Sequence, residues 1–367
     1  MVRRYGFRRS ATIATGIASC VSGLAAAQSS VTLYGSMDAG VQYVSNRAGQ
    51  HEWGAEQAYT QTDRWGLYGV EDLGGGNRAI FRLEDGFSTI TGALVNSSAV
   101  FNRQAYVGLS SNSLGTLTLG HQTPFNFDWL GPFSTMYLSP SWYMAHPGNI
   151  DELANTSAVQ INNSVRYVSP NFYGLTLGSL FGFSNSSNFG SGRQYSLGAK
   201  FTRGPFAFSA VYSNETQRTP NLATGLGLTE FQGINLITGT YTANHVDNIG
   251  VGASYTIGNF LFHAVYTNVK LQRANLSSRY QSYDGGVSYQ VSPYNSIGTG
   301  IATTTLSGMR WDQYVVSDVY SLSKSTQLYA SVVYEHATGG AVASLNTIGP
   351  SSNGKQFVPV VGMHHSF

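Results

Sequence analysis

The chain has few charged residues: Asp, Glu, Lys and Arg make up 10% of its 367 residues, against about 25% in ordinary soluble domains. It also has a single cysteine, Cys20. After the N-terminal region there is no uncharged apolar run of about 18 residues, which excludes a protein that crosses a membrane with helices. Long blocks of helix-forming residues at a 3.6-residue period are also missing, which argues against a helix bundle.

What the chain does contain is glycine and aromatic side chains, with 43 Gly, 23 Tyr and 19 Phe. Intrinsic disorder is not expected of a chain so rich in aromatic and aliphatic residues. Low charge with abundant Gly and Tyr is typical of a transmembrane β-barrel, in which half of the strand positions face lipid and half face water.

Residues 1–27 have the pattern of a cleavable signal peptide. An arginine-rich start is followed by a mildly apolar stretch at 11–24 and by three small residues that end at Ala27, the features that signal peptidase requires. The basic residues of this leader are Arg3, Arg4, Arg8 and Arg9. We therefore expect export, with cleavage near Ala27 and a mature domain of residues 28–367.

Removal of the leader changes two properties of the chain. The 20 basic residues lose four, which leaves 16 against 18 acidic residues, so nucleic-acid binding is not expected. Cys20 is lost as well, which excludes a disulfide, a thiolate metal site and a cysteine nucleophile in the mature protein.

The mature chain begins with a strict alternation of apolar and polar residues. In residues 31–43 the odd positions include Val31 and Leu33, and the even positions include Tyr34, Ser36 and Asp38. Successive side chains of a strand point to opposite faces, so this pattern predicts a strand with one apolar and one polar face. The same pattern recurs near residues 175–183, 195–201, 206–212, 249–255, 260–266 and 328–334.

Turn signals and polar stretches separate these strands. Short Gly-, Asn-, Pro- or Ser-rich turns occur at 72–77, 111–113, 169–171, 203–205, 292–295 and 323–326. Longer polar stretches occupy 45–61, 121–163, 184–193, 214–247, 270–280 and 339–355. Short turns at one end and long loops at the other indicate an outer-membrane barrel, and the length predicts about 16 strands. A soluble β-sandwich or propeller is the alternative, but Tyr and Phe near the strand ends favour the membrane girdles of a barrel.

Several segments together resemble one known family. They are Val-Thr-Leu-Tyr-Gly at 31–35, Asp-Arg-Trp-Gly-Leu-Tyr-Gly-Val-Glu-Asp-Leu-Gly-Gly-Gly at 63–76, Phe-Asn-Arg-Gln-Ala-Tyr-Val-Gly-Leu at 101–109, Leu-Thr-Leu-Gly at 117–120 and the C-terminal Gly-Met-His-His-Ser-Phe. The chain resembles the general diffusion porins of the Gram-negative outer membrane, in their betaproteobacterial, neisserial-like branch.

The resemblance implies an all-β fold, a 16-stranded antiparallel transmembrane barrel with its third long loop folded into the lumen. It implies a homotrimer in outer-membrane lipid that passes small hydrophilic solutes and ions passively, without catalysis, cofactor or metal. The terminal Phe367 resembles the aromatic end that the barrel-assembly machinery reads.

Alternation assigns several side chains to the lumen. Tyr34, Ser36 and Asp38 share the polar face of the first strand. Trp65 and Leu67 would face lipid, which places Arg64 and Tyr68 inside, and the same reasoning places Arg78, Arg82 and Glu84 inside. We also assign Arg103 to the lumen with Gln104 and Tyr106 on the opposite face, and Arg166 to the lumen between Val165 and Tyr167. An arginine that faced lipid at mid-depth would cost about 2–4 kcal/mol.

The resemblance gives these side chains a role at the pore constriction. In the family, the positions that match Arg64, Arg103 and Arg166 form a ladder of basic residues on the wall, and alternation adds Arg82. The infolded loop, placed at residues 122–162, should supply the opposing carboxylates, for which the candidates are Asp128, Asp151 and Glu152. Because Asp151 and Glu152 are adjacent, we expect one of them to serve the loop's own hydrogen bonds.

Guanidinium groups that face carboxylates across water create a transverse field that orients solutes without tight binding. Ser36 and Tyr68 stand where relatives often carry basic residues, and His121 replaces a usual arginine. We therefore expect a weaker anion preference than in a fully basic constriction.

Two other functions are open at this point. A substrate-selective porin would need an aromatic track through the lumen, for which the loop offers Phe125, Phe127, Trp129, Trp142 and Tyr143. An outer-membrane enzyme would need a Ser/His/Asn or paired-carboxylate constellation at the membrane rim, and no such spacing is found.

Overall fold

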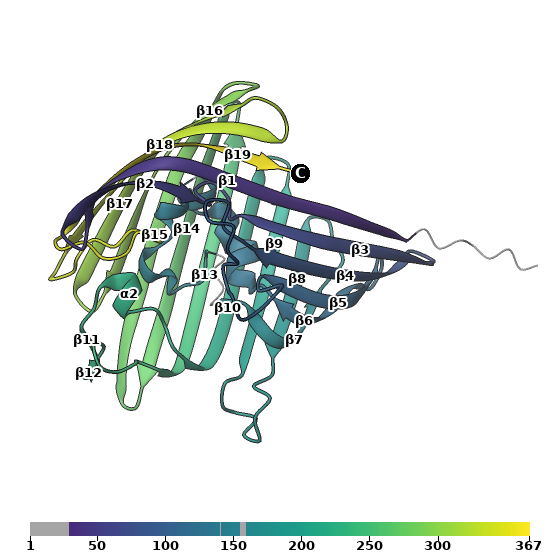
Figure 1. The fold of residues 1–367 in the computed structure, drawn as a ribbon. Coiled ribbons are helices and arrows are strands. Elements are labelled where there is room, and N and C mark those ends of the chain that lie inside the picture. The colour runs from purple at the N-terminus through teal and green to yellow at the C-terminus, as the bar shows by residue number, and fades with distance from the viewer. Residues whose placement is uncertain (1–28, 140, 155–158) are drawn as a thin grey trace, which may run out of the picture.

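The computed structural model of the protein describes residues 29–139, 141–154 and 159–367, so the predicted leader lies outside the described residues. One antiparallel sheet runs through most of the chain and curls around a lumen (Figure 1). Within the described ranges, no helix is both long enough and apolar enough to cross a membrane.

The strands follow one another around the wall in chain order. Their bounds are β1 (Ser30–Arg47), β2 (Gln50–Gln57), β3 (Arg64–Gly74), β4 (Asn77–Gly86), β5 (Gln104–Ser111), β6 (Gly115–Gln122), β7 (Ile161–Val168), β8 (Leu175–Gly182), β9 (Gln194–Arg203), β10 (Phe206–Arg218), β13 (Ala243–Ile257), β14 (Phe260–Arg273), β15 (Leu276–Ser292), β16 (Asn295–Leu306), β17 (Met309–Ser321), β18 (Thr326–Thr338) and β19 (Lys355–Ser366). A separate small hairpin is formed by β11 (Glu230–Phe231) and β12 (Ile234–Asn235), after the short helix α2 (Ala223–Leu226).

The first and last strands close the barrel. β1 pairs with β19 from Ser36↔Ser366 to Gln42↔Val360. On its other side β1 pairs with β3 along its first half and with β2 along its second half. β2 and β3 are therefore two parts of one wall strand, interrupted at residues 58–63. The wall has 16 strand positions, which confirms the predicted 16-stranded antiparallel barrel.

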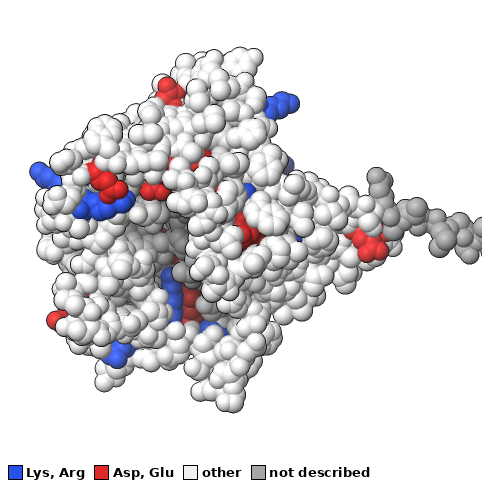
Figure 2. All heavy atoms as spheres, viewed as in Figure 1, with Lys and Arg blue, Asp and Glu red and all other residues white. Residues whose placement is uncertain are grey.

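The outer surface is apolar and the inner surface polar. On β1, the outward Leu33 is 59% exposed, whereas the inward Ser36 and Asp38 are fully buried. Figure 2 shows few charged atoms on the outer surface in view, and a group of basic and acidic side chains in the central hollow. Such an exposed apolar surface needs lipid around it.

Most predicted turns and loops have the expected lengths. The wall strands are joined by tight turns at the predicted sites, and a further tight turn joins β13 to β14 at Gly258. Long connections lie between β6 and β7, β8 and β9, β10 and β13, and β18 and β19, as predicted, and a further one, which was not predicted, joins β4 to β5.

Two polar stretches that were predicted as loops are mainly strand. Residues 45–61 include the end of β1 and all of β2, and β14 and β15 run to within two residues of each other across the predicted loop 270–280. The prediction was wrong because these strands extend above the apolar band. There, both faces carry polar side chains and alternation disappears.

The connection between β6 and β7, here called the β6–β7 loop (residues 123–160), packs against inward-facing wall residues. It contains the helix α1 (Thr135–Leu138) and short helical turns at Asn126–Leu130, Gly131–Phe133, Trp142–Met144 and Pro147–Asn149. At two of the closest approaches the wall carries glycine: a Cβ at Gly252 would lie 2.7 Å from the Phe133 ring, and one at Gly198 would lie 2.7 Å from Trp129.

Candidate pore constriction

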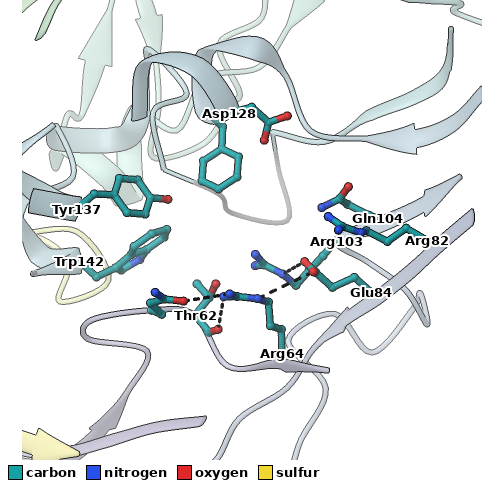
Figure 3. Close-up of a pocket in the computed structure, with 11 residues that line it drawn as sticks. Thr62, Arg64, Arg82, Glu84, Arg103, Gln104, Asp128, Tyr137 and Trp142 are labelled. Carbon is teal, nitrogen blue, oxygen red and sulfur yellow. Dashed lines mark hydrogen bonds and ion pairs between the residues drawn. The ribbon is translucent and has the colours of Figure 1, made fainter. Parts of the chain in front are cut away.

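A cavity of about 260 Å³ lies between the β6–β7 loop and the wall formed by β3, β4 and β5 (Figure 3). Asp128, Tyr137 and Trp142 lie on its loop side, and Arg82, Glu84 and Arg103 on its wall side. Its lining residues are Gln61, Thr62, Arg64, Arg82, Glu84, Arg103, Gln104, Phe127, Asp128, Tyr137 and Trp142. The cavity thus brings together five of the residues proposed from the sequence: Arg64, Arg82, Glu84, Arg103 and Asp128.

Glu84 is the centre of the wall-side charges. Arg103 Nε lies 2.7 Å from Glu84 Oε1, and Arg64 Nε lies 3.9 Å from Oε2. The hydroxyl of Tyr34 donates to the same Oε2 at 2.8 Å. One carboxylate is therefore shared by two guanidinium groups and a phenol. The buried ion pair with Arg103 compensates most of the negative charge of Glu84.

The break between β2 and β3 holds Arg64. Its Nη1 donates to the carbonyl of Thr62 at 3.1 Å, and its Nη2 donates to Gln61 Oε1 at 3.0 Å. Both acceptors are neutral, so most of the positive charge of Arg64 is left in the cavity. Gln61 and Thr62 were not predicted as lining residues, because nothing in the sequence marks the strand break.

Arg82 lies between two tyrosines. Its guanidinium carbon is 5.5 Å from the centre of the Tyr34 ring and 5.2 Å from that of Tyr68, distances at which the ring faces attract a cation. Among the described residues, its Nε has no hydrogen-bond partner. Aromatic faces thus orient this cation, and in the part of the chain that the structure describes no carboxylate lies close enough to form an ion pair with it.

Arg166 lies beside the cavity and neutralises the loop carboxylate. Its Nη1 is 2.6 Å from Asp128 Oδ2, and its guanidinium stacks on Phe125 at 4.4 Å. The Thr123 hydroxyl donates to Asp128 at 2.9 Å. Asp128 therefore faces the wall arginines with its charge already largely paired.

The assignment of Gln104 and Tyr106 to the face opposite Arg103 was wrong. Gln104 lines the cavity together with Arg103, and the outward residues of β5 are Val107 and Leu109, each 60% exposed. Arg103 precedes the first residue of β5. Strand alternation therefore does not determine its direction, and it reaches the cavity from the end of a loop.

Asp151 and Glu152 lie away from the arginine cluster. Asp151 Oδ2 is 2.6 Å from His146 Nδ1 and accepts from the Thr267 hydroxyl at 2.6 Å. The other ring nitrogen of His146, Nε2, is 3.4 Å from Asp284 on β15. Burial alone would lower the pKa of His146, but the two carboxylates outweigh it and raise the pKa to about 10. A buried imidazolium between two carboxylates thus fastens the β6–β7 loop to the far wall.

Glu152 belongs to a second buried cluster. Arg218 lies 3.3 Å from Glu152 and 3.2 Å from Glu215, so one guanidinium serves two carboxylates. Burial raises the pKa of Glu152 to about 8; Arg218 opposes the shift and Glu215 adds to it. Asp151 and Glu152 therefore both hold the loop in place.

The remaining sequence candidates have structural contacts near the barrel seam. Ser36 pairs with His364 Nε2 at 2.9 Å, and Asp38 accepts from Tyr329 at 2.7 Å and from the Thr60 amide at 2.8 Å. Phe367 exchanges backbone hydrogen bonds of 3.0 and 3.1 Å with Gly35, and its ring is 51% exposed on the outer surface.

The loop aromatics do not form a continuous path. Phe127 and Trp142 line the cavity, whereas Phe125, Trp129 and Tyr143 are buried in packing between loop and wall. This arrangement gives little support to a substrate-selective aromatic track. The described residues also contain no group of three or more His, Asp, Glu or Cys side chains that could hold a metal ion.

Comparison with known proteins identifies the family. Residues 11–340 match the model of the Gram-negative porin family. Outer membrane porin protein 32 of Delftia acidovorans is 28% identical, with 94% of this chain and 96% of the relative covered. Major outer membrane protein P.IB of Neisseria meningitidis is 27% identical, with coverage of 93% and 96%.

Among solved structures, the anion-selective porin from Comamonas acidovorans superimposes with a TM-score of 0.77 and 25% identity, over 93% of this chain and 100% of that one. The predicted betaproteobacterial resemblance, outer-membrane location and channel function are confirmed by these matches. The chain belongs to the Gram-negative porin family and is an outer-membrane porin, a barrel for passive diffusion.

Proposed function

We propose that the cavity between the β6–β7 loop and the arginine wall is the constriction of a diffusion pore with a modest preference for anions. The observation that carries this proposal is the charge balance. Arg64 and Arg82 project into the cavity with mainly neutral partners, while Glu84 is paired with Arg103 and Asp128 with Arg166.

The excess charge acts on ions through water. A unit charge about 6 Å from a passing ion in water contributes about 0.7 kcal/mol, which is about threefold in relative permeability. Salt screens the effect beyond roughly 8 Å. Two such charges favour anions without holding them, as conduction requires. The Comamonas acidovorans porin is described as anion-selective, which supports the sign of this preference.

Neutralising these arginines tests the proposal. Arg64→Gln and Arg82→Gln are each expected to lower the ratio of anion to cation permeability by about threefold. The measurement is the reversal potential in planar bilayers under a salt gradient. The control is Arg78→Gln, an exposed arginine on β4 outside the cavity. Strong anion selectivity that survives in the double variant Arg64→Gln/Arg82→Gln would refute the assignment.

We also propose that the chain loses residues 1–27 on export, assembles as a homotrimer in outer-membrane lipid and presents Phe367 to the barrel-assembly machinery. The resemblance to porins and the exposed position of Phe367 at the seam support this. The intact mass of the mature protein should correspond to residues 28–367, and single-channel records should show conductance steps in threes. A monomeric native mass, or single conductance steps throughout, would contradict the trimer.

A further inference from the structure

The outer face of β14 and β15 changes in chemistry in four regular steps. Outward positions lie opposite one another in register, while the intervening residues Val265, Thr267 and Val269 are buried against the interior. Toward the loop end, the outward pairs are Ala264–Gly285, Tyr266–Tyr283, Asn268–Gln281 and Lys270–Arg279. The order is small, aromatic, amide and cationic, which is the polarity gradient of one leaflet of a membrane.

At the lower end of this gradient the outer wall has a groove. Ala253 and Ala264 are register partners on β13 and β14 and leave a hollow of about 310 Å³. Phe208, Val251 and the Tyr266–Tyr283 pair border it, and the two tyrosine rings are 4.8 Å apart. An apolar groove at hydrocarbon depth has the form and chemistry to take an acyl chain.

The amide step connects the tyrosines to the cations. The Tyr266 hydroxyl accepts hydrogen bonds from Asn268 at 3.2 Å and from Gln281 at 2.9 Å. Asn268 in turn accepts from Arg279 Nη1 at 3.3 Å. The tyrosine pair marks the edge of the hydrocarbon region, and the cations lie four residues further, about 13 Å along the strand. That is the depth of lipid head groups.

The cationic step is unusual because Lys270 and Arg279 are direct cross-strand partners, and like charges in that position repel. Arg279 is held by an amide. Lys270 Nζ donates at 3.1 Å to the Gln272 amide, in the amide orientation that satisfies both groups. Asp247 is the cross-strand partner of Lys270 on β13, but among the described residues the two form no ion pair. Its carboxylate instead accepts from Tyr212 at 3.0 Å, from Asn214 at 2.8 Å and from Gln272. An anion between the two cations would remove their repulsion.

We propose that this face binds a phosphate-bearing lipid of the outer leaflet. Its phosphate lies between Lys270 and Arg279, and one acyl chain lies in the groove over Ala253 and Ala264. Two observations favour this ligand: the two cations are complementary to a phosphate, and each of the four outward residue pairs has the polarity of the membrane layer at its depth. The proposal rests on the outer-membrane location and is independent of the pore charges.

The first test uses the full mature protein in detergent, with diphosphoryl lipid A, its monophosphoryl form and inorganic phosphate as probes. Lys270→Gln/Arg279→Gln is expected to weaken retention of the diphosphoryl lipid by about 25-fold in native mass spectrometry, about fivefold for each cation. Arg203→Gln/Lys324→Gln removes two exposed cations at the opposite end of the barrel and should leave retention unchanged. An equal loss in both variants would overturn the proposal.

The second test addresses the groove. Ala264→Leu fills it and should weaken retention severalfold, whereas Ala330→Leu, at an outward position on β18, should not. Circular dichroism checks that each variant keeps its barrel. Unchanged lipid retention in Ala264→Leu would overturn the acyl-chain site. Competition by millimolar inorganic phosphate as effective as that by the lipid, or cross-linking of position 264 between two copies, would also overturn the proposal.

Discussion

Replacing His146 with alanine is expected to destabilise the β6–β7 loop by about 3–5 kcal/mol, the usual effect of leaving buried charges without their partner. The carboxylates of Asp151 and Asp284 would face each other without the imidazolium that lies 2.6 and 3.4 Å from them. We expect a lower midpoint of thermal unfolding in detergent and noisy single-channel currents. His263→Ala is the matched control, since this buried histidine donates its Nδ1 hydrogen to the Phe133 carbonyl at 3.0 Å and forms no ion pair with a carboxylate among the described residues.

The same ion pair makes loop stability depend on pH. The pKa of His146 is raised from 6.5 to about 10, so its contribution is fully present below about pH 6.5 and is lost as the pH rises toward 10. The midpoint temperature of thermal unfolding of the wild-type protein should therefore decrease as the pH is raised from 7 to 10. This decrease should disappear in His146→Gln. A slope that persists unchanged in the variant would show that another group causes it. His146→Ala/Asp151→Asn should recover part of the stability lost in the single variant.

Replacing Glu84 with glutamine should affect both stability and selectivity. Arg103, which is 8% exposed, would lose the carboxylate that lies 2.7 Å from its Nε. The expected decrease in the free energy of unfolding is about 3 kcal/mol. The constriction would also gain one positive charge, so the ratio of anion to cation permeability should rise about threefold. Thermal unfolding and reversal potentials measure the two effects.

The control for this prediction is Asp85→Asn. Asp85 neighbours Glu84 and accepts from Asn102 at 2.6 Å, but it does not line the cavity. It should leave selectivity unchanged. If Glu84→Gln lowers stability without moving the reversal potential, the excess-charge explanation of selectivity fails, although the ion pair would still be structural.

Alternation was sufficient to predict the wall because each strand lies between lipid and water. It gave the outward direction of Leu33 and the inward direction of Ser36 and Asp38, as the structure has them. The rule stops at strand ends: Arg103 precedes β5, and its direction depends on the loop before it. The break at residues 58–63 was equally invisible, since no Gly or Pro marks it.

The roles of Asp151 and Glu152 could not be predicted for a different reason. Their partners Thr267 and Arg218 lie more than 60 residues away in the chain. Composition places carboxylates in the loop but does not say which wall each one meets. Because the two residues are adjacent, one of them was expected to serve the loop itself, and in the structure both do.

The seam between β1 and β19 determines the order in which the barrel can form. Ser36 and His364, which meet there, are 328 positions apart, whereas almost every other strand pairs with its neighbour in sequence. Closing so long a stretch of chain has the highest entropy cost of any step, and contacts of high sequence separation slow folding. Hairpins should therefore form early and the seam last, so the polypeptide remains an open, edge-exposed ribbon until its final dozen residues dock.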